Sequence, residues 1–309
     1  MLRLLPLYFL LSLFFLGCDD DDDNSEDPND DFAIEELGDD VNIFATNATP
    51  VAVYDNIIAT LSANEAIGIV AEVNHQQNAA NNGLELPFTR TILFGNPTLG
   101  TPIMQANQLA GLDLPQKMVT LEVNGETVAA YNAVSYLRDR HGISNSLLEP
   151  IETALSNIVN ASAPTGVFLA GEAGTEFNEG IIEQTSTRSF DATFSALVDA
   201  ITTNENLILV DSLDHQANAA SVDLELRPTK LIIFGNPDLG TPLMQNNQGI
   251  SLDLPQKMLV YEMEDGTVRV AYNDPDYLAD RFDLGDGLEE TLTTIAGALD
   301  NLATAATGN

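Results

Sequence analysis

The hydrophobic positions along the chain predict the same series of helices and strands twice. Apolar side chains recur at i, i+3, i+4 and i+7 in residues 54–61 and again in residues 194–201. This spacing gathers apolar side chains on one face of a helix. A strand is predicted after each helix, over 67–73 and over 207–213.

The second part of each series begins with an apolar run, TILF or LIIF, that stops at Gly-Asn-Pro. Glycine and proline there indicate a strand end followed by a tight connection. A β-hairpin with a short glycine-containing turn is predicted next, over 117–131 and 257–272. A closing helix follows, with an apolar stripe at Leu288, Leu292, Ile295, Leu299 and Leu302. Helices combined with hairpin-linked strands predict an α+β fold, in which an antiparallel sheet is backed by helices.

The series repeats because a whole domain is duplicated. Residues 75–123 align with 215–263 without a gap, and 30 of the 49 positions are identical. An offset of 140 residues is too long for a solenoid repeat and suits a domain. We therefore expect two homologous domains, at 44–162 and 186–309, joined by a glycine-containing linker at 163–185. The first strand of the second domain is expected near Thr187.

Several linked motifs resemble the domain of unknown function 302 family. They are a His followed by Ala residues, a strand ending in Gly-Asn-Pro, Gly-Thr-Pro-Leu-Met, Asp-Leu-Pro-x-Lys, and Tyr-Asn-Asp before the closing helices. The second domain is nearer to this pattern, since the first has Pro87-Phe88 in place of Arg-Pro and lacks the Asp after Asn132. The resemblance implies a fold similar to the TATA-box-binding-protein-like α+β fold, and members that pair as dimers. It implies no established activity.

The amino terminus has the pattern of an export signal. Arg3 precedes an apolar stretch that is shorter than the about 20 residues needed to span a membrane. The only cysteine, Cys18, follows directly after Leu16-Gly17. Residues 1–17 therefore resemble a bacterial lipoprotein signal peptide, with Cys18 as the lipidated first residue of the mature chain. A plain signal peptide or an uncleaved anchor is the alternative.

Charge is distributed unevenly. The chain has 47 acidic residues against 11 Lys and Arg, and 13 of the acids lie in residues 19–40 without a base. Like charges repel, so residues 18–43 are expected to form an extended acidic tether. A net charge of −36 argues against binding to nucleic acid or, by charge, to anionic lipid. The acidic run after Cys18 resembles the signal of surface-exposed lipoproteins, so we expect an outer-membrane, cell-envelope location.

The few cations and histidines are candidate ligand-binding residues, because several occupy equivalent positions in both domains. Histidine titrates near neutral pH and suits acid–base or ligand contacts, whereas a purely structural histidine would bond a neighbouring loop. The lysine after Asp-Leu-Pro could contact an anionic ligand or pair with the aspartate four residues before it. The candidates are His75, Lys117, Arg140, His215, Lys257 and Arg281, together with Asn96 and Asn236 of the two Gly-Asn-Pro motifs.

Other site classes find less support in the sequence. The motif from Gly95 to Gly100 matches the start of a phosphate-binding loop, but Thr101 and Pro102 stand where its Lys and Ser/Thr are needed. A His–Met metal or haem site using Met104 or Met244 is disfavoured, since such a methionine more often packs into the core. No catalytic residue, metal site or cofactor is assigned.

These patterns favour a lipid-anchored envelope protein that binds a small ligand or an envelope protein without catalysis. The two domains could hold one ligand each or pack on each other as a dimer would. The alternative is an envelope enzyme or redox accessory that uses a His/Lys pair, His215 with Lys257 for example. A mainly structural spacer is the third reading.

The lipid anchor can be tested by replacing the cysteine. Cys18→Ser removes the thiol to which lipid is attached, so the variant is expected in the soluble fraction while the parent chain fractionates with membranes. Immunoblotting of separated fractions measures this. If the variant remains with membranes, the lipoprotein interpretation is wrong.

Overall fold

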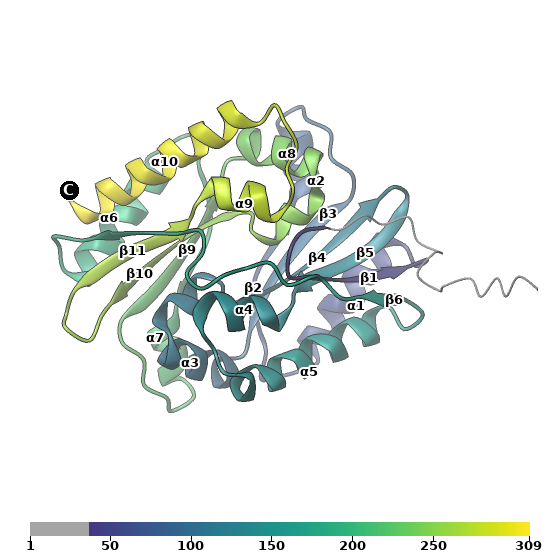
Figure 1. Ribbon diagram of the computed structural model, residues 1–309, viewed down its shortest axis with the longest axis horizontal. Helices are drawn as coiled ribbons and strands as arrows, with labels where there is room; N and C mark the ends of the chain where they lie inside the picture. Colours follow the sequence, from purple (N-terminus) through teal and green to yellow (C-terminus); the bar gives the residue numbers. More distant parts are fainter. Residues whose placement is uncertain (1–36) are drawn as a thin grey trace, which may run out of the picture.

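The computed structural model describes residues 37–309, so the predicted signal peptide, Cys18 and most of the acidic tether lie outside the described residues. The described chain folds into two antiparallel sheets, each with helices on its outer face (Figure 1). This is the α+β architecture predicted from the sequence. Among the described residues, no helix is both long enough and apolar enough to cross a membrane.

The first sheet has six strands in the order β2-β3-β4-β5-β1-β6. Their bounds are β1 Val41–Thr46, β2 Gly68–Asn74, β3 Thr89–Gly95, β4 Gln116–Val123, β5 Glu126–Asn132 and β6 Val167–Leu169. The second sheet has five strands in the order β7-β11-β10-β9-β8. Their bounds are β7 Ile181–Thr185, β8 Ile208–Asp214, β9 Thr229–Gly235, β10 Gln256–Glu262 and β11 Val268–Asn273.

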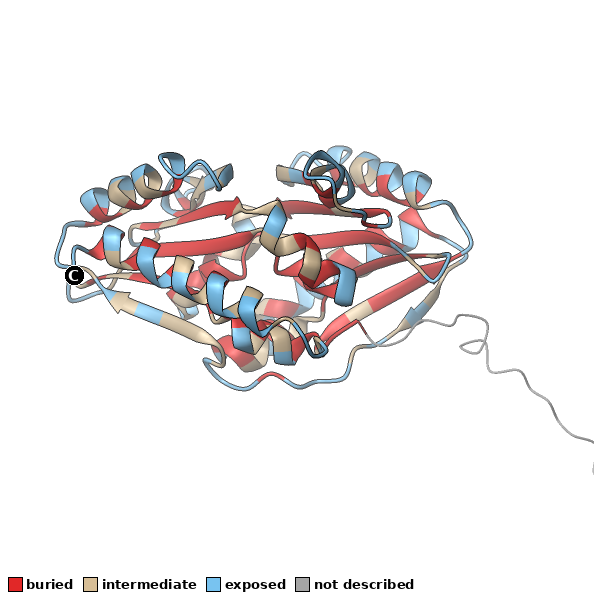
Figure 2. Ribbon diagram, turned by 90° about the horizontal axis from the view of Figure 1, so that it is seen from above, coloured by how far each residue is buried: buried red, intermediate tan, exposed pale blue. Residues whose placement is uncertain are grey.

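Two long helices cover the outer face of each sheet, where the predicted apolar stripes lie. They are α1 Pro50–Ser62 and α5 Asn145–Ser162 on the first sheet, and α6 Phe190–Thr202 and α10 Glu289–Thr307 on the second. Their exposed faces point to solvent while the strands beneath are buried (Figure 2). The predicted helices, strands and hairpins are confirmed at these places.

The sequence suggested tight turns at the Gly-Asn-Pro motifs, but these motifs begin helices. These are α3 Pro97–Ala106 and α8 Pro237–Asn246. Asn96 accepts a hydrogen bond from the Thr98 backbone N–H at 3.0 Å, and proline is the first helical residue. An asparagine cap followed by proline is a typical helix start, and it outweighs the internal glycine and proline.

The histidines also begin helices, where only a short polar segment was expected. The helices are α2 His75–Asn81 and α7 His215–Ala220. Asn74 and Asp214 cap them by accepting hydrogen bonds from the backbone N–H two residues beyond each histidine. Each cap fixes the histidine at the junction between a strand and a helix.

The predicted domain boundaries shift at both ends of the first domain. Strand β1 starts at Val41, inside the predicted tether, and Leu37 is buried in a hydrophobic core to which both domains contribute. The predicted linker contains β6 and β7, the outermost strands of the two sheets on that side. The first strand of the second domain is thus β7, which ends before Thr187. Strands of three and five residues are too short to show the alternation that predicts a strand.

The two domains pack against each other through the inner faces of their sheets. Each domain places a short 3₁₀ helix on the sheet of the other. Helix η1 Gln108–Leu112 of the first domain contacts β9, β10 and β11, and η2 Gln248–Leu252 contacts β3, β4 and β5. Gln108 donates to the Thr229 hydroxyl at 2.7 Å, and Gln248 donates to the Thr89 hydroxyl at 2.8 Å. Apolar side chains from both domains form a common core, among them Leu93, Leu112, Leu231, Ile233 and Leu259.

The remaining small helices complete this reciprocal contact. Helix α2 packs against α8 and α7 packs against α3, so each histidine helix lies on the other domain (Figure 1). Helices α4 Val134–His141 and α9 Pro275–Arg281 follow the hairpins and carry Arg140 and Arg281.

Candidate functional site

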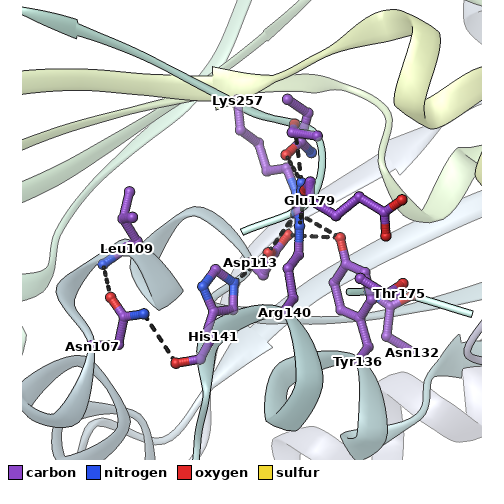
Figure 3. A network of polar contacts seen from close by, with 12 residues as sticks. Asn107, Leu109, Asp113, Asn132, Tyr136, Arg140, His141, Thr175, Glu179 and Lys257 are labelled. Atoms are coloured by element: carbon purple, nitrogen blue, oxygen red, sulfur yellow. Dashed lines mark hydrogen bonds and ion pairs between the residues drawn. The ribbon is translucent and has the colours of Figure 1, made fainter. Parts of the chain in front are cut away.

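Six charged side chains from both domains meet in a buried cluster, which we call the central ion network. Its members are Asp113, Lys117, Arg140, Asp253, Lys257 and Arg281. Each of them is at most 4% exposed, and Figure 3 shows one half of the network. The aspartates end η1 and η2, the lysines begin β4 and β10, and the arginines end α4 and α9.

The lysines connect the two domains. Lys117 Nζ lies 2.9 Å from Asp253 Oδ1 of the second domain. Lys257 Nζ lies 3.2 Å from the same oxygen and 3.7 Å from Asp113 Oδ1 of the first domain. The ion pair considered from the sequence, lysine with the aspartate four residues before it, is therefore present only at Lys257. Lys117 pairs with the aspartate of the other domain.

The arginines bind within their own domain and across to the other. Arg140 Nη1 lies 2.8 Å from Asp113 Oδ2, and its Nη2 donates to Asn273 Oδ1 at 3.0 Å. Arg281 pairs with Asp253, and its Nη2 donates to Asn132 Oδ1 at 2.9 Å.

A tyrosine ring of each domain also stacks on the arginine of the other domain. The guanidinium of Arg281 lies 3.9 Å from the centre of the Tyr136 ring, and that of Arg140 lies 4.8 Å from the centre of the Tyr277 ring. Stacking of this kind adds a cation–π attraction to the ion pairs.

The network holds both carboxylates ionised. Burial raises the pKa of Asp253, but the charges of Lys117, Lys257 and Arg281 outweigh burial and bring it well below its ordinary value. Burial likewise opposes ionisation of Asp113, and Arg140 and a hydrogen bond from His141 lower its pKa well below that value. Burial lowers the pKa of Lys117 to about 7 despite its partner.

This geometry gives Lys117, Lys257, Arg140 and Arg281 intramolecular partners in place of the ligand expected from the sequence. All four are buried between the domains, and each is paired with a carboxylate. This pairing is needed because an unpaired charge in a buried position would be costly. Their repetition in both domains reflects the symmetry of the contact. The structure thus separates them from the other four candidates, which line cavities.

The first cavity, about 730 Å³ in volume, lies beneath α5. Its walls come from α5, the start of α3, the segment 114–116 and the beginning of β2. The second domain supplies the remaining wall through β8, through His215 and Asn218 of α7, and through Val222 just after that helix. Asn96 also lines this cavity.

The second cavity occupies the equivalent place in the second domain and is smaller, about 120 Å³. It lies beneath α10 and is bounded by the start of α8, residues 254–256 and Asn236. The first domain contributes Val73, His75 and Asn78. Each domain therefore completes the cavity of the other.

The histidines are buried at the edge of these cavities and held neutral. Burial lowers the pKa of His75 and of His215 to about 4. His75 Nε2 lies 3.1 Å from the Thr91 hydroxyl. Leu231 stands at the position equivalent to Thr91, and the buried Nε2 of His215 has no hydrogen-bond partner. The sequence-predicted His/Lys pair is not brought together as a site, since among the described residues no lysine lines either cavity.

Sequence reasoning missed several residues that the fold places at these sites. Thr101 and Thr241 line the two cavities. Thr101 was noticed only as a departure from a phosphate-binding loop, and Thr241 was not singled out. His141 Nε2 lies 2.8 Å from Asp113 Oδ2, but it has no histidine counterpart in the second domain. Equivalence between the domains was the signal for the threonines. Within residues 37–309, no group of three or more His, Cys, Asp or Glu is placed to hold a metal ion.

Comparison with known proteins identifies the repeated domain. The family model described as domain of unknown function DUF302 matches residues 44–162 and 182–302. The crystal structure of the uncharacterized conserved protein DUF302 from Bacillus stearothermophilus is similar to 41% of this chain, at 16% identity and a TM-score of 0.38, and 98% of that chain is covered.

Curated relatives match over one short region. The fluoride-specific ion channel FluC 1 of Brucella suis biovar 1 (strain 1330) is 51% identical over 73 residues, or 24% of this chain and 29% of that protein. FluC 1 of Brucella abortus biovar 1 (strain 9-941) has the same identity over 27% of its length. The chain thus spans less than a third of the curated relatives it matches.

The central ion network predicts a large effect of removing one carboxylate. Asp253→Asn keeps the shape of the side chain but leaves Lys117 and Arg281 without their counter-charge, and Lys257 with only its 3.7 Å contact to Asp113. The free energy of unfolding is expected to fall by about 3–5 kcal/mol, measured by urea denaturation. Asp139→Asn, which breaks an exposed pair with Arg138, is the control and should cost about 1 kcal/mol or less. A loss at Asp253 no larger than that of the control would contradict the structural role.

The neutral histidines predict a pH dependence of stability. Burial lowers the pKa of His215 in the folded chain to about 4, whereas the ordinary pKa of histidine is 6.5, so the unfolded chain binds more protons between these two values. The free energy of unfolding should therefore fall as the pH drops from 6.5 to 4, by about 3 kcal/mol for each histidine. His215→Gln should make the curve correspondingly flatter. An unchanged slope would show that this histidine is not held neutral.

Proposed function

The chain belongs to the DUF302 family, and from this premise we propose that it is a lipid-anchored cell-envelope protein that binds small apolar molecules without a reaction. The paired cavities are the observation that carries the proposal. They occupy equivalent places in the two domains, and each is lined by residues of both domains. The lipid on Cys18 and the acidic stretch after it would attach the two domains to the envelope, outer membrane or cell surface.

The lining of the cavities supports an apolar ligand. The second cavity is lined by apolar side chains that include Phe234, Leu254, Ile295, Leu299 and Leu302. The first cavity presents the equivalent residues Phe94, Leu114, Ile151, Leu155 and Ile158. A volume of about 730 Å³ falls within the range of about 300–1,000 Å³ that is typical of ligand pockets. The second cavity would accept a smaller molecule or open further on binding.

The way the cavities are built supports binding in both. A capped helix start, at Asn96 or Asn236, lines each cavity, and a histidine helix from the other domain lines it as well. Because the central ion network fixes the two domains to each other, these walls are held in place before a ligand arrives. Preorganised walls lower the cost of ordering on binding.

The alternative function, an envelope enzyme or redox accessory with a His/Lys pair, gains no support from this geometry. His75 and His215 are at the cavities, whereas Lys117 and Lys257 are engaged by Asp113 and Asp253 in the central ion network. Interaction with another envelope protein stays a separate prediction, because the cavities concern small ligands only.

The proposal can be tested by filling the cavities. Ala154 and Ala298 line the first and second cavity at equivalent places on α5 and α10. Ala154→Trp with Ala298→Trp in the intact chain should reduce binding of an apolar fluorescent dye at least tenfold. Mass spectrometry of solvent extracts should show apolar molecules with the parent protein and not with the double variant.

The control is Ala161→Trp, at an exposed position near the end of α5. It should bind the dye and retain co-purifying molecules as the parent does. If the parent chain binds neither dye nor co-purifying molecules, or if filling both cavities changes nothing, the proposed function is wrong.

A further inference from the structure

Each cavity contains a buried hydroxyl group with no hydrogen-bond partner. Thr101 is among the residues that line the first cavity and Thr241 among those that line the second, and both residues are 1% exposed. The Oγ1 atom of each is buried and has no hydrogen-bond partner. Leaving a buried hydroxyl unpaired costs about 1–3 kcal/mol. The same cost arises at the same place in both domains, which points to a partner that the protein itself does not supply.

Other helical threonines of this chain find a partner within their own helix. Thr60 donates to the Asn56 carbonyl at 2.8 Å, Thr153 to the Glu149 carbonyl at 2.9 Å, and Thr294 to the Glu290 carbonyl at 2.8 Å. This bond to the carbonyl four residues back is the usual choice of a threonine inside a helix. Thr101 and Thr241 lie inside α3 and α8 and do not make it.

The first cavity holds a second unpaired donor. Gln116 lines it, and the side-chain Nε2 of Gln116 is buried without a hydrogen-bond partner. A hydroxyl and an amide N–H can both donate to one oxygen atom, because an oxygen of a carbonyl or an ester accepts two hydrogen bonds. Most of the other residues that line this cavity are apolar, although Asn64, Asn96 and Asn218 line it too.

The charges around the cavities disfavour an anion. Among the described residues, no Lys or Arg lines either cavity, and His75 and His215 are neutral at pH 7 because burial lowers their pKa to about 4. The charged residues that line the first cavity are acidic, Glu65 and Asp211. A carboxylate or phosphate entering here would lose its hydration without gaining a counter-charge.

The rims of the cavities are apolar and partly exposed. Ile69 at the start of β2 lines the first cavity and is 36% exposed, and Ile208 at the start of β8 lines the second and is 51% exposed. Both belong to the outermost strands of their sheets. Such residues at an opening favour a ligand that is itself apolar along its length.

We propose that the cavities take a neutral, elongated apolar molecule with one carbonyl or ester oxygen, which accepts hydrogen bonds from Thr101 in the first cavity and Thr241 in the second. This inference rests on the proposed function and adds the chemical class and orientation of the ligand. The oxygen lies at the floor beside α3 or α8, Gln116 donates a second bond in the first cavity, and the hydrocarbon part extends toward the rim.

The test compares three probes of similar length: methyl decanoate, decanoate and undecane. Each competes with the apolar dye for the intact chain, first unchanged and then with Thr101→Val and Thr241→Val together. Valine keeps the shape of threonine and removes only the hydroxyl. The parent should bind methyl decanoate about tenfold more tightly than undecane, as one well-made hydrogen bond allows. The double variant should reduce that preference to about twofold or less and leave undecane binding unchanged. Thr153→Val, whose hydroxyl already bonds within α5, is the matched control and should behave as the parent does.

The outcomes separate this inference from the function beneath it. Equal binding of ester and hydrocarbon by the parent, with no change on removing both hydroxyls, would overturn the inference while the cavities still bind apolar molecules. Tighter binding of decanoate than of its methyl ester at pH 8 would overturn the inference, because the cavities would then prefer an anionic ligand to a neutral one. Failure of all three probes to displace the dye, with the dye also bound by the cavity-filling variant, would overturn the proposed function itself.

Discussion

Two buried aspartates, Asp113 and Asp253, determine how the rest of this molecule is arranged. Each directly follows a 3₁₀ helix that lies on the sheet of the other domain, and each forms an ion pair with an arginine of its own domain. The lysines then cross between them. Removing such carboxylates from water is costly unless every cation is placed correctly. The contact between the domains is therefore specific as well as apolar, and the relative position of the two sheets follows from it.

The cavities are a consequence of that contact. Because η1 and η2 are exchanged, α7 reaches the first domain and α2 reaches the second. Each histidine then lines a cavity that is otherwise formed mainly by the other domain. A ligand bound there would touch both domains at once. Changes in the central ion network and in ligand binding should accordingly influence each other, although they involve different side chains.

The sequence predicts the elements well and their partners poorly. Alternation and helical spacing identified α1, α5, α6, α10 and the hairpins, because each of these elements has one face in a core. The starts of α3 and α8 were missed, since glycine and proline dominate a short motif and the capping role of asparagine needs a helix to be recognised. The spacing from Asp113 to Lys117 equals that from Asp253 to Lys257, so nothing in it reveals that Lys117 pairs across the domains. Such exchange depends on long-range packing, which a local pattern does not contain. The four candidates His75, His215, Asn96 and Asn236 do reach the cavities, while the four cations form the contact between the domains.

The covalent connection through β6 and β7 gives the two halves a freedom that identical partners lack. In a pair of identical chains every substitution appears on both sides of the axis. Here His141 bonds to Asp113, whereas the equivalent position of the second domain is Phe282. Likewise Thr91 bonds to His75, whereas the position equivalent to Thr91 is Leu231. Gly180, where a Cβ would clash with the Tyr277 ring, lets the connecting segment pass close over α9. One gene thus encodes both sides of the interface separately, so that the two compartments can diverge in size and in hydrogen-bonding capacity while the shared frame stays common to both.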